Sequence, residues 1–146
     1  MEISSRNVKV LLKAITDCFQ ERKEELCALD RIIGDGDHGE SMERGTIAGY
    51  QAVKALPDTE KVYEHFKVYS RRMMTHIGGA IGPIFASIIQ EIGEASKESG
   101  VIGKNEYTVG LNNAARKVMD LGGAKVGDKT LVDALVPAAE AAEKNA

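Results

Sequence analysis

Apolar residues recur along most of the chain at steps of three and four positions. The first series runs from Val8 to Phe19, and later series lie at 62–73, 84–92, 111–121 and 131–142. Such steps place side chains on one face of an α-helix. The pattern therefore predicts six helices, at about residues 5–28, 39–56, 60–77, 82–98, 105–121 and 129–144, with Ser5 as the N-cap of the first.

The same pattern predicts an all-α fold. Alternating apolar and polar positions bounded by turns, which indicate strands, are absent from the sequence. Short connections between helices favour antiparallel neighbours. With 146 residues, the chain suits a single domain over 1–146, and we expect an antiparallel up-and-down helical bundle or barrel.

The composition of the chain argues against two classes of binding partner, nucleic acid and membrane. The chain is 43% hydrophobic and 28% charged, with a net charge of −3 and no long basic run, so neither nucleic acid nor an anionic membrane is an expected partner. There is no apolar signal core at the N-terminus and no stretch of about 18 apolar residues that could span a bilayer. We expect a cytoplasmic protein in which Cys18 and Cys27 are reduced thiols.

Glycines cluster in three predicted loops, at 34–39, 78–82 and 122–127. These loops follow the first, third and fifth predicted helices, so an up-and-down path brings them to one end of the bundle. A turn between helices needs only one or two glycines. The clusters therefore indicate a site lined by backbone.

The first loop carries three carboxylates, Asp30, Asp35 and Asp37. Its Gly-x-Gly-x-x-Gly pattern matches a dinucleotide-binding fingerprint, but that fingerprint follows a strand, and here a helix precedes it. Carboxylates repel phosphate unless a cation lies between them, and Mg²⁺ prefers carboxylate and phosphate oxygens. We therefore expect a magnesium site that holds nucleotide phosphates, with Asp35 and Asp37 as the catalytic residues.

Other interpretations of this loop explain less. A calcium-binding EF-hand that starts at Asp35 would need an oxygen ligand at Gly39 and a glutamate at Thr46. A capping turn would account for Asp37 alone. His38 could be a general base, a phosphoryl acceptor or a nucleotide contact, and a hydrogen-bonding role is favoured.

The second and third loops each precede a predicted helix. In the second, Gly78 to Ile81 come just before Pro83, so N–H groups at the helix start could bind an anion, although an ordinary tight turn is the alternative. In the third, Lys129 could pair with phosphate or be solvated. Walker, protein-kinase, serine-hydrolase and zinc-protease signatures are absent, which leaves Mg²⁺-assisted phosphoryl transfer on a helical scaffold.

Three segments together resemble the L subunit, the nucleotide-binding domain, of dihydroxyacetone kinases. They are Leu29–Gly39 with Met42 and Arg44-Gly45, Gly78–Pro83, and Gly122–Ala124 continuing to Asp133–Leu135. The resemblance implies a helical barrel with a nucleotide (ADP or ATP) and two Mg²⁺ ions at one end. It implies Asp30, Asp35 and Asp37 as metal ligands. It implies nucleotide contacts from His38, Gly39, Glu40, Ser41, Gly79, Ala80, Ile81, Gly122, Thr130 and Leu131.

The resemblance also implies partners. In the phosphotransferase-system branch of this family, ADP stays bound as a coenzyme. A phosphocarrier (M-type subunit) rephosphorylates it, and it donates to dihydroxyacetone held on a separate K subunit. In the single-chain branch ATP is the donor, and a short L-type chain resembles the former. The alternatives are a non-catalytic regulatory or adaptor protein of the same fold and a kinase subunit for a different small substrate.

The chain departs from the family pattern at three places. Ser41 replaces the usual asparagine, and Ile81 replaces the usual serine, which removes a hydroxyl from the phosphate region. Family members have about eight helices, whereas this sequence reaches Ala146 after the sixth predicted one. We therefore expect a truncated or shortened member of the family. Because an open barrel would expose apolar helix faces, we also expect a possible homodimer.

Overall fold

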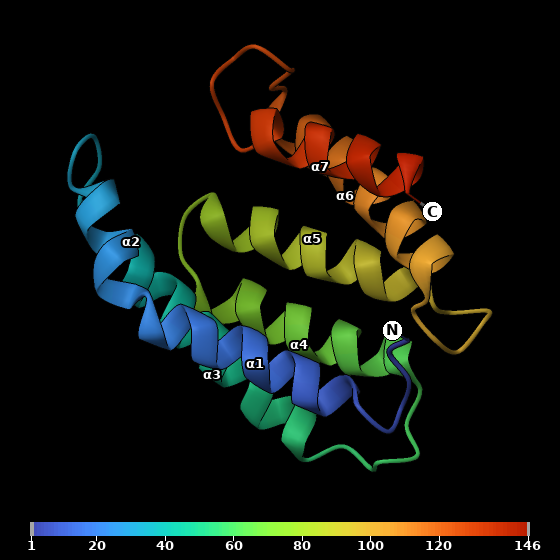
Figure 1. Cartoon of the computed structure of the whole chain (residues 1–146). Helices are drawn as coiled ribbons and strands as arrows, with labels where there is room; N and C mark the ends of the chain where they lie inside the picture. Colours follow the sequence, from blue (N-terminus) through green and yellow to red (C-terminus); the bar gives the residue numbers. More distant parts are fainter. Residues whose placement is uncertain (1, 146) are drawn as a thin grey trace.

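The computed structural model describes residues 2–145, and within them the regular structure is seven α-helices (Figure 1). The helices are α1 (Val8–Glu21), α2 (Lys23–Asp30), α3 (His38–Lys54), α4 (Val62–His76), α5 (Ile81–Glu94), α6 (Lys104–Gly122) and α7 (Val132–Lys144). In this part of the chain the strand-like pairing consists of one isolated bridge, between Ile3 and Ile102. The predicted all-α class is confirmed.

The first predicted helix, at 5–28, is wrong in extent and is in fact two helices, so the count is seven and not six. Arg22 interrupts it with φ −101° and ψ 12°. The sequence has no proline or glycine at this break, and a close contact with α3 lies one residue beyond it. Gly39 approaches the Lys23 carbonyl so closely that a Cβ at residue 39 would lie 2.1 Å from that oxygen. The predicted cap is also wrong, because Asn7 is the N-cap and its Oδ1 accepts from the Ser4 N–H at 2.7 Å.

The helices form an antiparallel up-and-down arrangement, as predicted. Helices α1 and α2 pack on α3, and the packing then continues in chain order from α3 to α7. Figure 1 shows the loops after α2, α4 and α6 at one end of the bundle, with both chain termini toward the other end. The three glycine clusters therefore share one end of the molecule.

Two buried apolar clusters pack the helices together. The larger one joins α1, α3, α4 and α5 around Leu12, Met42 and Phe66, and the smaller one joins α6 and α7 through Leu111 and Leu135. In the larger cluster the Tyr69 hydroxyl lies 2.9 Å from the Thr16 hydroxyl, and burial raises the pKa of Tyr69 to about 12. None of the helices over residues 2–145 has the length and apolar character needed to cross a bilayer.

Candidate functional site

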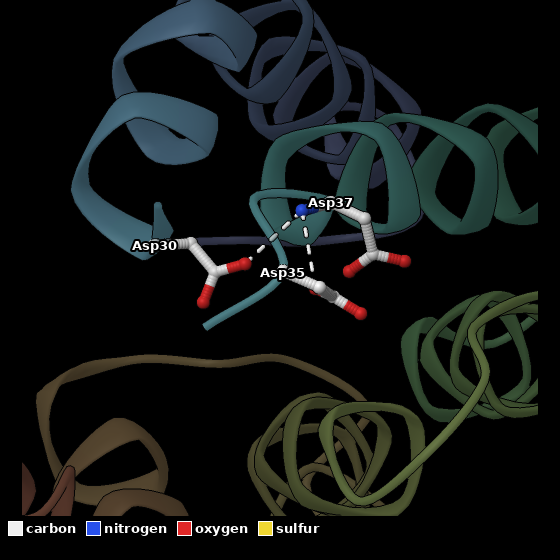
Figure 2. A group of neighbouring side chains, drawn as sticks. All are labelled: Asp30, Asp35 and Asp37. Atoms are coloured by element: carbon white, nitrogen blue, oxygen red, sulfur yellow. Dashed lines mark hydrogen bonds between the residues drawn. The ribbon is translucent and has the colours of Figure 1, made fainter. Parts of the chain in front are cut away.

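The loop between α2 and α3, residues 30–37, brings three carboxylates together; we call it the acidic loop. Asp30 is the last residue of α2, Asp37 is the N-cap of α3, and Asp35 lies between them. One oxygen from each side chain lies within 4.8 Å of the others. Figure 2 shows the three carboxylates turned to the same side of the loop. The predicted grouping of these residues is therefore present.

Backbone N–H groups fix the first of these carboxylates. Gly36 N and Asp37 N both donate to Asp30 Oδ2, at 2.8 and 3.0 Å. Gly36 has φ +80°, a conformation that favours glycine. A Cβ at residue 34 would lie 2.2 Å from Asp30 Oδ1. These two glycines let the loop turn back on Asp30.

The Asp37 carboxylate is available although the residue sits at a helix cap. It makes no capping bond to the α3 backbone and instead accepts a hydrogen bond from Ser41 Oγ at 3.2 Å. Among residues 2–145, none of the ion pairs includes Asp30, Asp35 or Asp37. Each of the three side chains therefore retains an oxygen without a cationic partner.

The spacing of these oxygens fits a small divalent cation. Two oxygens that coordinate one Mg²⁺ at about 2.1 Å lie at most about 4.2 Å apart. The three oxygens, which lie within 4.8 Å of one another, could bind a single ion if the side chains moved closer together, or they could serve two neighbouring ions. An all-oxygen carboxylate set is also the chemistry that Mg²⁺ prefers.

A pocket of about 330 Å³ opens beside the acidic loop, and the second glycine loop forms its opposite wall. Its lining residues are Asp30, Asp35, Asp37, Ser41, Arg44, Gly78, Gly79, Ala80 and Ile81. A Cβ at residue 78 or 79 would meet nothing within 4 Å, so this wall offers uncovered backbone, and Gly79 has φ +64°. The wall leads into the first turn of α5, where Pro83 lies as predicted.

Several residues expected to contact nucleotide lie next to this pocket without lining it. The His38 ring packs on Phe85 of α5, with ring centroids 5.9 Å apart, and Gly39 is buried against the Lys23 carbonyl. Glu40 is exposed. Ile81, by contrast, lines the pocket, and its side chain also packs against the larger apolar cluster.

The third glycine loop, residues 123–131, is organised around its own backbone. Asp133 accepts from Gly127 N at 2.6 Å and Thr130 N at 2.9 Å, and these two bonds lower the pKa of the Asp133 carboxyl. Gly122, Thr130 and Leu131 are exposed and do not line the pocket beside the acidic loop. The loop between α6 and α7 lies at the same end of the bundle as the loops after α2 and α4 (Figure 1).

Two residues of this region, Arg44 and Asp133, were not predicted as site residues from the sequence. Arg44 had a signal, because it lies three positions after Ser41 on α3 and therefore shares a helix face with it. Asp133 had one too, since a threonine followed three positions later by an acidic residue marks a helix start. Gly78 lines the pocket through its backbone alone.

Comparison with known proteins places these features in a family. Residues 32–146 match the family model described as the DAK2 domain. The ADP-binding subunit DhaL of the PEP-dependent dihydroxyacetone kinase of Escherichia coli is 30% identical over 140 residues, which cover 96% of this chain and 66% of that protein. The D-erythrulose kinase of Mycolicibacterium smegmatis is 28% identical over 141 residues, 96% of this chain and 24% of that protein.

Solved structures agree on the fold. The native dihydroxyacetone kinase of C. freundii superimposes with a TM-score of 0.77 at 24% identity, covering 94% of this chain and 25% of that one. The same enzyme in complex with AMP-PNP and Mg²⁺ gives a TM-score of 0.70 at 27% identity, covering 91% and 24%. The chain thus spans about a quarter of the single-chain kinases and just under two thirds of the E. coli subunit.

Proposed function

The chain belongs to the DAK2 domain family, and from that membership we propose that it binds an adenine nucleotide with Mg²⁺ and donates a phosphoryl group to dihydroxyacetone or a similar small ketose. The observation that carries this proposal is the pocket in which three unpaired carboxylates face uncovered glycine backbone. One wall suits metal ions, and the other suits phosphate oxygens.

In this proposal the two walls have different tasks. Asp30, Asp35 and Asp37 would hold two Mg²⁺ ions, which neutralise charge on the phosphates, and Asp35 and Asp37 would be the catalytic residues. N–H groups at the start of α5 would bind phosphate oxygens. The remaining proposed nucleotide contacts are His38, Gly39, Glu40, Ser41, Gly79, Ala80, Ile81, Gly122, Thr130 and Leu131.

The reaction itself asks little covalent chemistry of the protein. An acceptor hydroxyl oxygen forms a bond to phosphorus while the bond from phosphorus to the diphosphate oxygen breaks, and the hydroxyl proton leaves to a base. The chain's contribution is to position the phosphoryl group and to offset its negative charge.

We further propose that the acceptor is held on a separate K-type subunit and that a phosphotransferase-system phosphocarrier recharges the bound ADP. The relatives described as ADP-binding subunits of PEP-dependent and PTS-dependent kinases support this. Exposed apolar side chains on and beside the first and third glycine loops also support a docking partner at this end: Leu29, Ile32, Ile33, Leu121, Val126 and Leu131. A docked partner would exclude water from the transfer.

A ketotetrose is the second candidate acceptor. Relatives described as D-erythrulose kinase and L-erythrulose kinase are as similar to this chain as the dihydroxyacetone kinase subunits. Because the acceptor would bind to the partner, nothing in the pocket of this chain favours one ketose. Phosphorylation assays with a K-type subunit and each ketose in turn separate the two.

The test of the nucleotide proposal is a calorimetric titration of the 146-residue chain with ADP, with and without Mg²⁺. We expect saturable binding of one ADP that requires Mg²⁺, because the carboxylates would otherwise repel the diphosphate. Binding of equal strength without a divalent ion, or no binding at all, contradicts the proposal.

A further inference from the structure

Arg44 lies where the two walls of the pocket meet. It sits on α3, three positions after Ser41, and its guanidinium reaches across to the C-terminus of α4. Arg44 Nε donates to the His76 carbonyl at 2.9 Å, and Nη2 donates to Ser41 Oγ at 3.2 Å. The His76 carbonyl is one of the four that a helix leaves unpaired at its C-terminus, a position that attracts a cation.

These anchors hold the guanidinium but do not neutralise it. Both acceptors are uncharged, and among the ion pairs of residues 2–145 none involves Arg44. A guanidinium has five N–H donors, and the two anchoring bonds use Nε and Nη2, so Nη1 remains for a ligand. Arg44 is therefore held in place by two hydrogen bonds, and its positive charge is not neutralised by an acidic side chain of residues 2–145.

The surroundings indicate what that charge would meet. Within the described residues, Arg44 is the one cation among those that line the pocket, which also include the three carboxylates, Gly78 and Gly79. Ser41 links it to the acidic loop, since its hydroxyl accepts from Arg44 and donates to Asp37. A guanidinium N–H in this position suits a phosphate oxygen, to which it can donate a charge-assisted hydrogen bond.

We propose that Arg44 binds an oxygen of the terminal, transferable phosphoryl group of the nucleotide. This rests on the proposed nucleotide function and goes further, because it assigns the charge of that one group to a residue of this chain. Metal-bound carboxylates would hold the diphosphate, and Arg44 would recognise the phosphoryl group that is present in the triphosphate and absent from ADP.

The test compares two ligands on one variant. Calorimetry in the presence of Mg²⁺ measures the affinity of wild-type and Arg44→Gln protein for ADP and for AMP-PNP. Loss of a charge-assisted hydrogen bond at this partly exposed position should weaken AMP-PNP binding by about tenfold or more. ADP binding should change less than about threefold, so the ratio of the two affinities shifts.

Two further variants complete the experiment. Arg44→Lys keeps the charge without the planar fork, so its affinity ratio should lie between those of wild type and Arg44→Gln. Arg71→Gln is the matched control, because Arg71 is an exposed residue of α4 outside the pocket lining. It should leave both affinities unchanged.

The outcomes separate this inference from the proposed function. If Arg44→Gln weakens ADP and AMP-PNP by the same factor, or neither, Arg44 is a structural residue and the inference is overturned. If wild-type protein binds neither ligand with Mg²⁺, the nucleotide proposal itself fails. Thermal unfolding of each variant identifies a loss of folding, in which case Arg44→Lys supplies the decisive ratio.

Discussion

The acidic loop and the third glycine loop have similar compositions but use them in opposite ways. Both combine glycines with aspartates at one end of the bundle (Figure 1). In the acidic loop, backbone N–H groups donate to Asp30 Oδ2 and, at 3.4 Å, to Asp35 Oδ1, while Asp35 and Asp37 remain exposed and, among residues 2–145, without a cationic partner. In the third loop, Asp128 and Asp133 accept hydrogen bonds from the loop's own backbone.

The glycines of the two loops also differ in how closely other atoms approach them. A Cβ at residue 34 would lie 2.2 Å from Asp30 Oδ1, and one at residue 36 would lie 2.4 Å from Arg31 Cγ, where Gly36 also has φ +80°. A Cβ at residue 123 or 127 would meet nothing within 4 Å, and glycine there serves a positive φ. A loop rich in glycine and aspartate is therefore not by itself a metal site. What distinguishes the acidic loop is that its three carboxylates lie close together and, within residues 2–145, are free of cationic partners.

The largest effect should follow from removing a carboxylate of the acidic loop. Asp35→Asn or Asp37→Asn should weaken Mg²⁺-dependent ADP binding by at least about 100-fold, because each removes a proposed metal ligand. Asp128→Asn, the matched change in the third loop, should leave the affinity within about threefold of wild type. Calorimetry of the three variants measures this, and equal losses from both loops would refute the distinction.

A smaller loss should come from crowding Asp30. Gly34→Ala places a methyl group against Asp30 Oδ1, so that carboxylate must turn away, and the affinity for ADP with Mg²⁺ should fall by about tenfold or more. Stability should change little, because the atom displaced belongs to a side chain. Gly103→Ala, at the N-cap of α6, is the control and should leave binding unchanged; an unaffected Gly34→Ala protein would contradict the proposed role of Asp30.

Removing the Asp133 carboxylate, which accepts hydrogen bonds from the third loop at the first turn of α7, should loosen that loop alone. Because backbone N–H groups lower the pKa of folded Asp133, its stabilising contribution is present above the ordinary value of 3.8 and is lost as pH falls through the lowered pKa. Asp133→Asn should reduce the hydrogen-exchange protection of Gly127 and Thr130 at neutral pH. The difference from wild type should disappear in strong acid, and a difference that persists there would show another cause.

The smallest effect concerns the backbone of the third loop. Lys129 has φ +59°, which costs a non-glycine residue about 1 kcal/mol, and asparagine tolerates this conformation better. Lys129→Asn should raise the free energy of unfolding by about 0.5 kcal/mol. Denaturant unfolding measures this change, and a destabilised variant would mean that the Lys129 side chain contributes contacts that offset the strain.

Much of the fold followed from helical periodicity, because amphipathic stripes such as the one through Phe66 and Met73 are local features. The break at Arg22 could not be predicted in the same way. No proline or glycine marks it, and the feature beside it, the close approach of Gly39 to the Lys23 carbonyl, is a tertiary contact.

In the candidate site, too, the features that lie close together in the sequence could be predicted, and those that depend on tertiary contacts could not. Asp30, Asp35 and Asp37 could be grouped from sequence because they lie within eight residues of one another. Their meeting with the second glycine loop followed from the up-and-down path. The bond from Arg44 to the His76 carbonyl joins residues 32 positions apart and depends on where α4 ends, so no local pattern could indicate it.

The most direct test of the central claim is to locate the metal. Mn²⁺ with ADP, added at substoichiometric level to isotope-labelled protein, broadens the amide signals nearest to the ion. The account predicts the strongest broadening at Asp35, Gly36 and Asp37, weaker broadening at Gly79 and Ala80, and none of either in Asp35→Asn protein. Broadening centred on Asp128 and Asp133, or unchanged by the Asp35 substitution, would contradict it.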